Sequence, residues 1–178
     1  MPTSTADLWA TIAGEAERES RLWRDALRPA GEREQEAVFS PLGDERYALG
    51  LETIYEGYLA HYGRPRLFAP VDADTSLLLG DYLYAHGLVR VADVGTVDAV
   101  ADLAELISVC AQLRADDAVG DGAAWAASAA LLGTGALADA RTALREDGDD
   151  APLLALAREH AGADAVERAL AAHDRRLR

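Results

Sequence analysis

Two glutamates offer the clearest potential for chemistry, because Glu52 and Glu56 lie four positions apart in a stretch with helical periodicity. Residues at this spacing share one face of a helix. Paired carboxylates on one face can hold Mg²⁺, which prefers oxygen ligands. Two solvated or hydrogen-bonded glutamates would give the same pattern. The sequence therefore leaves a cation-binding pair and a structural pair as alternatives.

The six tyrosines of the chain all fall in two neighbouring predicted helices, where they recur at helical spacing. Tyr55, Tyr58 and Tyr82 could form the wall of a pocket for an apolar ligand, with their hydroxyls at its mouth. Aromatic residues at this spacing more often belong to a helical core. Arg64 and Arg66 follow the first of these helices. They could contact an anionic head group of such a ligand, or pair with aspartates of the next loop.

Two carboxylate–histidine pairs repeat along these helices, Glu56 with His61 and Asp81 with His86. If the two helices pack antiparallel, the four side chains could gather around one transition-metal ion. However, residues five apart point about 140° away from each other on a helix, so one helix presents such a pair poorly. We therefore expect no metal site and interpret both histidines as core or capping residues, while Asp81 remains a candidate ligand-binding residue.

The acidic composition, with a net charge of −14, argues against several functional classes. Nucleic acids and anionic membrane surfaces attract Lys and Arg, and an acidic chain is repelled by them. The chain has no lysine, which rules out a Walker A phosphate loop and lysine Schiff-base chemistry. The single cysteine, Cys110, lies in an apolar run that predicts a buried, unreactive thiol. We recognise no signal peptide and no apolar run of membrane length, and expect a cytoplasmic protein without a membrane span.

Helical periodicity and a high alanine content predict an all-α protein, since β-branched residues never alternate as they do in a strand. The length suits a single domain over residues 1–178, built as a bundle of about seven or eight helices. The stretch 77–84 is apolar on most sides, so we expect its helix to be central in the fold. The predicted helices cover residues 4–27, 44–62, 72–91, 97–114 and 123–132, a short segment ending near 145, and residues 152–161 and 164–178.

A turn that reads Gly63-Arg64-Pro65 precedes a helix that reads Leu77-Leu-Leu-Gly-Asp-Tyr-Leu-Tyr84. This combination resembles the all-α polyprenyl diphosphate synthases, in which such a turn and helix follow the first aspartate-rich motif. Residues 97–107 and 124–132 resemble later helices of the same family, and the best-matching part of the chain is 50–132. The resemblance implies a helical bundle with an isoprenoid-synthase-like fold.

The chain departs from that family at the positions that carry its chemistry. No aspartate-rich motif precedes the turn at Gly63. After residue 132 the chain has a short acidic linker at 146–150, which does not read Asp-Asp-x-x-Asp. Ala124 and Trp125 stand where the family has a Lys-Thr pair. Prenyl transfer needs clustered carboxylates that hold magnesium ions on the departing diphosphate. The resemblance therefore implies a shortened, non-catalytic relative, or pseudoenzyme. No cofactor is expected, and Mg²⁺ only if a diphosphate site survives.

Such a relative would bind an isoprenoid or another apolar ligand, or serve as an accessory subunit. Its expected partners are a second copy, as in a homodimer or larger homo-oligomer, and a catalytic prenyl synthase subunit. Two alternatives remain open. One is a divergent, prenyltransferase-like enzyme that acts on a diphosphate or apolar substrate through Glu52, Glu56 and Asp81. The other is a helical protein–protein interaction module, since Ala-rich helical faces readily form homodimers.

Overall fold

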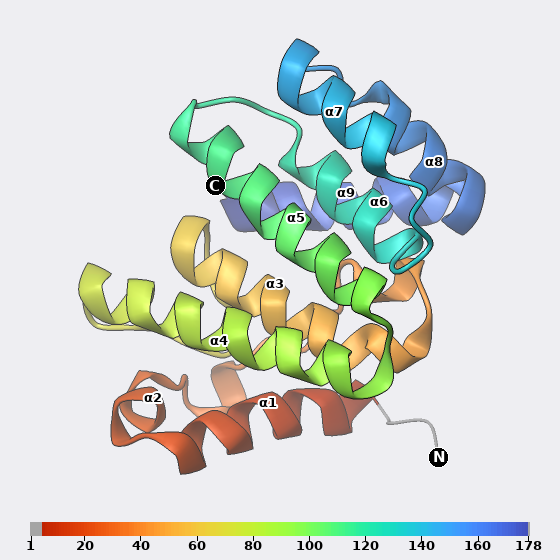
Figure 1. Cartoon of the computed structure of the whole chain (residues 1–178). Coiled ribbons are helices and arrows are strands. Elements are labelled where there is room, and N and C mark those ends of the chain that lie inside the picture. The colour runs from red at the N-terminus through yellow and green to blue at the C-terminus, as the bar shows by residue number, and fades with distance from the viewer. Residues whose placement is uncertain (1–4, 178) are drawn as a thin grey trace.

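The computed structural model describes residues 5–177, which fold into nine α-helices and three short 3₁₀-helices without a strand (Figure 1). The prediction of an all-α protein is therefore confirmed for this part of the chain. The α-helices are α1 (Thr5–Glu19), α2 (Arg21–Ala26), α3 (Ala48–Tyr62), α4 (Ala73–Val94), α5 (Val97–Ala115), α6 (Asp121–Ala130), α7 (Ala138–Asp147), α8 (Ala151–Ala161) and α9 (Ala163–Leu177). The 3₁₀-helices are η1 (Ala30–Glu32), η2 (Ser40–Leu42) and η3 (Glu45–Tyr47).

The helices are stacked in layers (Figure 1). α1 and α2 cover one side of the antiparallel pair α3–α4, while α5, α6 and α9 lie on its other side and α7 and α8 are outermost. The main hydrophobic core lies between α3 and helices α5 to α9, and a smaller core fills the space between α1–α2 and the α3–α4 pair. Within residues 5–177, none of the helices combines the length and the apolar character that a bilayer crossing requires.

Four glycines allow α3 and α4 to approach each other closely. A Cβ atom at Gly57 of α3 would lie 2.9 Å from the carbonyl oxygen of Gly80 in α4. The second close approach lies two helical turns away, between Gly50 of α3 and Gly87 of α4. A Cβ at Gly87 would lie 3.0 Å from the carbonyl oxygen of Gly50 and 2.3 Å from Cγ1 of Ile54. Side chains at these positions would push the helices apart, so the glycines fix both the distance and the register of the pair.

The predicted helix 4–27 is two helices, because the chain leaves the helical conformation at Ser20. This residue has extended backbone angles, φ −151° and ψ 144°, and its hydroxyl accepts a hydrogen bond from the N–H of Leu22 at 3.0 Å. Ser20 is thus the N-cap of α2. The division lets α2 turn back over α4, where Trp23 packs against Tyr82 with ring centroids 5.3 Å apart.

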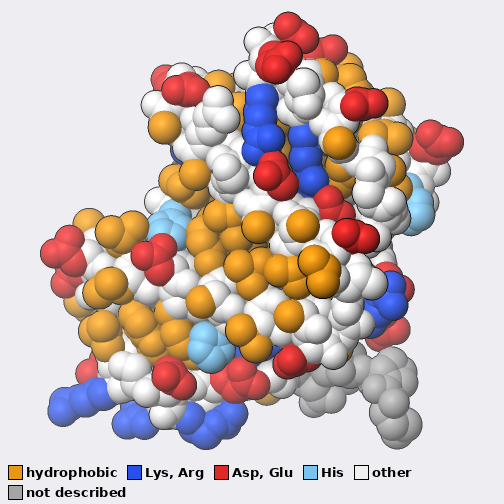
Figure 2. All heavy atoms as spheres, in the orientation of Figure 1, with side chains coloured by type: hydrophobic (Ala, Val, Ile, Leu, Met, Phe, Trp, Pro, Cys, Tyr) orange, Lys and Arg blue, Asp and Glu red, His pale blue; other side chains and the backbone are white. Residues whose placement is uncertain are grey.

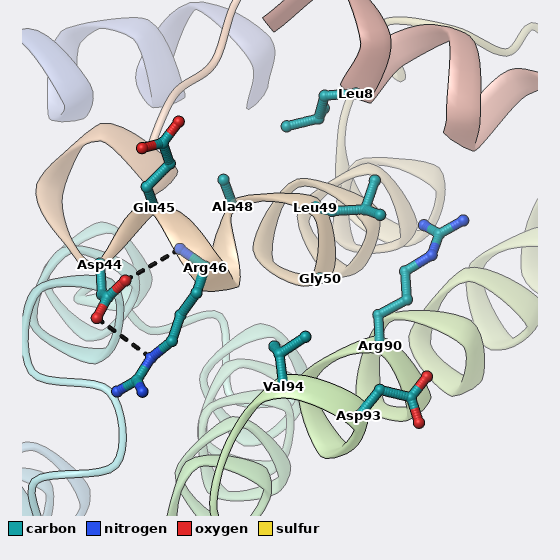
Figure 3. A pocket seen from close by; sticks show the side chains of 10 residues that line it. All are labelled: Leu8, Asp44, Glu45, Arg46, Ala48, Leu49, Gly50, Arg90, Asp93 and Val94. Atoms are coloured by element: carbon teal, nitrogen blue, oxygen red, sulfur yellow. Dashed lines mark hydrogen bonds and ion pairs between the residues drawn. The ribbon is translucent and has the colours of Figure 1, made fainter. Parts of the chain in front are cut away.

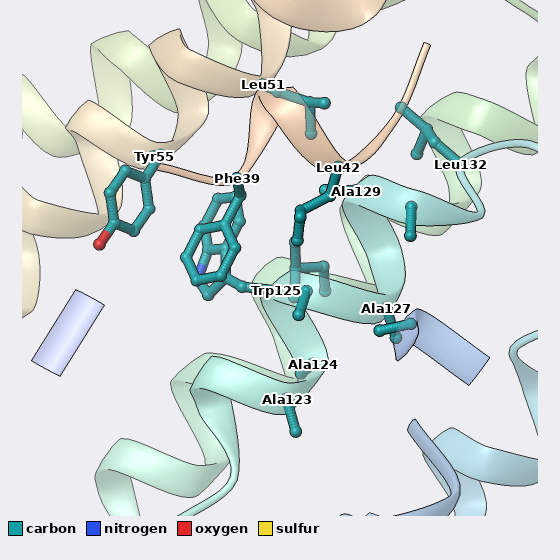
Figure 4. Packing of buried hydrophobic residues seen from close by; sticks show 14 of the residues in the cluster. Phe39, Leu42, Leu51, Tyr55, Ala123, Ala124, Trp125, Ala127, Ala129 and Leu132 are labelled. Atoms are coloured by element: carbon teal, nitrogen blue, oxygen red, sulfur yellow. The ribbon is translucent and has the colours of Figure 1, made fainter. Parts of the chain in front are cut away.

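The central helix of the fold is α6 rather than α4, which corrects the expectation drawn from the apolar run in α4. Leu78 and Val89 of α4 are 54% and 61% exposed. In α6 every residue from Ala123 to Ala130 is buried, and Trp125 stacks on Phe39 with ring centroids 5.6 Å apart (Figure 4). The small alanine side chains let α5, α8 and α9 approach the axis of α6 closely.

Candidate functional site

The two candidate glutamates point into the protein, where both bind Arg66. Glu52, Glu56 and Arg66 are fully buried. Nη1 of Arg66 donates to Oε2 of Glu52 at 2.5 Å, and its Nε donates to Oε2 of Glu56 at 2.9 Å. The guanidinium also donates to the carbonyl oxygens of Glu36 and Glu52, and lies 4.5 Å from the centroid of the Trp9 ring. Burial alone would lower the pKa of Arg66, but the two carboxylates outweigh burial and raise it above its usual value.

The remaining oxygens of both carboxylates accept hydrogen bonds from the backbone. Oε1 of Glu52 accepts from the N–H groups of Val38 and Ser40, at 3.2 and 3.1 Å. Oε1 of Glu56 accepts from the N–H of Leu67 at 2.7 Å. Every carboxylate oxygen of the pair therefore has a donor inside the fold. The cluster holds the segment that leads into η2 and the loop after α3 against α3. Glu52 and Glu56 are therefore the structural pair of the two alternatives that the sequence left open.

A second buried polar cluster centres on Asp121, at the start of α6. The hydroxyl of Tyr58 and Nη2 of Arg114 both donate to Oδ2 of Asp121. Nε2 of His173 lies 3.3 Å from the same oxygen, and its Nδ1 lies 2.9 Å from the hydroxyl of Tyr55. Because a carboxylate only accepts hydrogen bonds, the Nε2–H of His173 donates to Asp121, while Nδ1 shares a hydrogen bond with the Tyr55 hydroxyl. The cluster thus joins α3, α5, α6 and α9.

The charges of this cluster support one another. Burial alone would raise the pKa of Asp121, but the hydrogen bonds from His173 and Tyr58 and the charge of Arg114 hold it well below its usual range. The first turn of α6 adds its own N–H groups, which also favour an anion there. Burial and the charge of Asp121 raise the pKa of Tyr58 above its usual value. Asp121 is therefore an ionised carboxylate, and the hydroxyls of Tyr55 and Tyr58 are engaged within the fold.

A hollow of about 360 Å³ opens next to this cluster, lined in part by Arg114 and His173. The Arg114 side chain is 30% exposed, so it is the member of the cluster that a solute reaches most easily. Asp150 and Asp174 line the same hollow beside Asp121. These three carboxylates oppose the binding of an anion at Arg114, and the arrangement is best described as a structural junction.

Arg64, the other arginine of the predicted ligand site, caps a helix. Its backbone N–H donates to the carbonyl oxygen of Arg176 at 3.0 Å, and its Nη2 donates to that of Arg175 at 2.8 Å. Carbonyl groups at the end of a helix lack intrahelical partners, and a cation there is favourable. Arg64 thus fastens the end of α9 to the loop after α3. It lies apart from the buried Arg66, so the two arginines do not form one anion site.

The remaining candidates lie on α4 or face it. Asp81 is exposed and lies 3.4 Å from Nε2 of His61, so α3 and α4 bring two of the four side chains together, in a pairing different from the two that the sequence suggested. Burial lowers the pKa of His61, and the charge of Asp81 opposes this shift. Tyr82 is half-buried and packs on His86 with ring centroids 4.2 Å apart. The Glu56 carboxylate is engaged by Arg66, away from these side chains.

The weak candidates for metal ligands in the sequence are Glu56, His61, Asp81 and His86. Within the described part of the chain, no group of three or more His, Cys, Asp or Glu side chains is arranged to hold a metal ion. Cys110 is buried, as predicted, and burial raises the pKa of its thiol.

The members of the Asp121 cluster carry no local signal in the sequence. Asp121 lies 63 positions from Tyr58 and 52 positions from His173, so no short motif connects them. Two local features mark the site: Gly120 precedes an Ala-rich helix, and Asp121 lies in the first turn of that helix. Both are ordinary features of a helix N-terminus. The cluster therefore became visible only in the folded chain.

The outer surface of α4 and α5 carries exposed apolar side chains, and Figure 2 shows hydrophobic side chains gathered over both helices on one face. On each helix, one row of solvent-facing residues is spaced alternately four and three apart. We refer to these two rows together as the α4–α5 face. It consists of Leu78, Tyr82, Ala85, Val89 and Ala92 on α4, and Val97, Ala101, Ala104, Ser108 and Ala111 on α5. All of these residues are exposed except Tyr82, which is half-buried.

The alternating spacing of four and three is the pattern of helices that pack side by side in coiled coils and helical bundles. Val97 is 86% exposed, and Val89 is more than half exposed. Charged residues such as Asp81 and Asp93 flank the rows. An apolar area with a polar rim is typical of a protein–protein contact.

Comparison of the chain with protein-family models, with curated proteins and with solved structures finds no match.

Proposed function

We propose that this protein is a non-catalytic relative of the polyprenyl diphosphate synthases that acts by association with a helical partner through the α4–α5 face. In this role it would be a homo-oligomer or the accessory subunit of a catalytic prenyl synthase. The observation that carries the proposal is the pair of exposed apolar rows on α4 and α5. The proposal keeps two expectations from the sequence, a helical interaction surface and the absence of a catalytic role.

The non-catalytic part of the proposal is supported by the contacts of the candidate residues. Each oxygen of Glu52 and Glu56 already has a hydrogen-bond donor within the fold. To bind Mg²⁺ they would have to release Arg66, whose charge would then be buried without a partner. Such a rearrangement is costly. The engaged hydroxyls of Tyr55 and Tyr58 likewise favour association over the binding of a ligand by the tyrosines.

The form of the face indicates the kind of partner. Each row spans about two heptads, which is too short for an independent coiled coil, since these need three or four. The two rows lie on antiparallel neighbouring helices, so a partner with two such helices would cover both at once and form a four-helix contact. A second copy offers the same pair of helices, and a two-fold axis would place like faces together.

The proposal is tested by measuring the mass of the purified protein in solution with light scattering, from low to high micromolar concentration. We expect a dimer or larger oligomer, or a stable complex when a catalytic prenyl synthase of the same organism is added. Val89→Glu should weaken the association by at least about 10-fold, because it removes apolar contact and buries a charge. Val119→Glu is the matched control, since Val119 is 82% exposed and lies in the loop after α5.

Two results would refute the proposal. One is a monomer at all concentrations that also fails to bind the synthase subunit. The other is an oligomer that Val89→Glu leaves as stable as Val119→Glu does, because the contact would then lie elsewhere on the molecule.

A further inference from the structure

An elongated groove runs along the side of the molecule where α1, η3 and the end of α4 meet. Its larger part has a volume of about 570 Å³ and its smaller part about 290 Å³. Leu8, Glu45 and Ala48 line both parts, so the two are adjoining sections of one groove. The volume of the larger part falls within the range of about 300–1,000 Å³ that is usual for small-molecule sites. The groove borders the α4–α5 face at Asp93 and the buried Glu52 cluster at Ser40, but the residues of its apolar floor belong to neither.

The floor of the groove is apolar. Leu8 and Ala48 lie at its middle, and Leu49, Gly50 and Val94 continue the larger part (Figure 3). Val94 is 48% exposed, so apolar surface remains open to a ligand there. Such a floor favours an alkyl chain or another apolar body, which would release water from these side chains.

The two arginines of the groove already have partners. Arg46 pairs with Asp44 at 3.1 Å, as the dashed lines in Figure 3 show, and its guanidinium lies over the ring of Tyr47. Arg90 pairs with Glu15 and donates to the hydroxyl of Thr53. The charge of each arginine is therefore already compensated by a carboxylate, and neither adds an unpaired positive charge to the groove.

Two carboxylates of the groove, in contrast, make no ion pair with any described side chain. Glu45 stands where the two parts of the groove join, and Asp93 lies across the apolar floor from it (Figure 3). Both are exposed. The balance of charge along the groove is therefore negative, in a protein whose net charge is −14. This field attracts cations and repels anions.

From this combination we infer that the groove binds an elongated organic cation, an apolar body that carries a protonated amine. The apolar part lies along Leu8, Ala48 and Val94, and the amine pairs with Glu45. A fatty acid or a phosphorylated lipid would meet the same carboxylates with the wrong charge. A neutral alcohol of equal length would gain the apolar contact without the ion pair. The inference does not depend on association through the α4–α5 face.

The test compares three probes with the same ten-carbon chain: decylamine, decanol and decanoate. Binding to the full chain is followed by isothermal titration calorimetry at low salt, below the concentrations at which the probes aggregate. We expect decylamine to bind best and decanoate worst, with an advantage that shrinks as salt is added. Glu45→Gln should weaken decylamine binding about 2- to 5-fold, which is the usual range for one exposed ion pair.

Glu32→Gln is the matched control, because Glu32 is an exposed acidic residue in η1, away from the groove. Ala48→Trp provides a second test, since a large ring at this half-buried position fills the groove and should abolish binding of decylamine and decanol alike. The inference is overturned if decanol or decanoate binds as tightly as decylamine, if none of the probes binds, or if Glu45→Gln has no more effect than Glu32→Gln.

Discussion

Replacing Arg66 with methionine tests whether the buried Glu52–Arg66–Glu56 cluster holds the fold together. Methionine keeps part of the apolar length of the arginine side chain but removes its charge and its donors. Arg66 makes four hydrogen bonds, two to the carboxylates and two to the carbonyl oxygens of Glu36 and Glu52. In the variant both carboxylates stay fully buried and keep only their backbone donors.

The expected magnitude follows from the burial of all three groups. Removing one partner of a buried ion pair costs about 3–5 kcal/mol, because the remaining charge is left without compensation. Two carboxylates depend on Arg66, so we expect a loss of about 4 kcal/mol or more in the free energy of unfolding. This is a large fraction of the roughly 5–15 kcal/mol that stabilises a typical domain.

The assay is urea unfolding at neutral pH, followed by the circular dichroism of the helices. The midpoint should fall while the slope stays unchanged. Arg158→Met is the control, because Arg158 pairs with Glu167 at 2.6 Å but the two side chains are 42% and 58% exposed. Its cost should stay below about 1 kcal/mol. Adding Glu52→Gln and Glu56→Gln to Arg66→Met should restore part of the lost stability. If Arg66→Met costs no more than the control, the reasoning about this cluster is wrong.

Two further predictions concern the helix pair α3–α4 and the Asp121 cluster. Gly87→Ala should lower the free energy of unfolding by about 2 kcal/mol, since its Cβ would overlap Ile54 and approach a backbone oxygen. Gly31→Ala, where nothing lies within 4 Å, should be neutral or slightly stabilising in the same urea experiment. Asp121→Asn should cost about 1–3 kcal/mol at neutral pH. Because folding lowers the pKa of Asp121, its contribution is complete above the unfolded value of about 3.9 and is lost as the pH falls further. The difference in stability between wild type and Asp121→Asn should therefore shrink below pH 4, and a constant difference down to pH 2 would contradict the assignment.

The helices could be predicted from the sequence because their signals are local. Asp72 and Thr96 stand before apolar runs, and each caps the helix that follows it. The Asp72 carboxylate accepts from the N–H of Thr75 at 2.7 Å, and the Thr96 hydroxyl from that of Ala99 at 3.2 Å. The break at Ser20 has no such signal, because the apolar spacing continues across it although the chain changes direction there.

The surroundings of the candidate residues could not be predicted, because they depend on contacts between distant parts of the chain. The spacing of Glu52 and Glu56 placed them correctly on one helix face. No local pattern indicated that the Arg66 side chain would bind both glutamates. The pairing of Tyr55 with His173, 118 positions away, is equally invisible to a local pattern. The apolar character of α4 also gave no sign of which neighbour covers it, and much of it faces solvent.

The paired glycines of α3 and α4 restrict how the length of this protein can change. Removing one residue within either helix would rotate the rest of that helix by about 100°. Larger side chains would then stand where the glycines now allow contact, and both close approaches would be lost together. Insertions and deletions are therefore compatible with this helix pair only outside the stretches 50–57 and 80–87. Homologous chains should vary in length in loops such as 131–137. The spacing of seven residues between Gly50 and Gly57 in α3, and between Gly80 and Gly87 in α4, should stay the same.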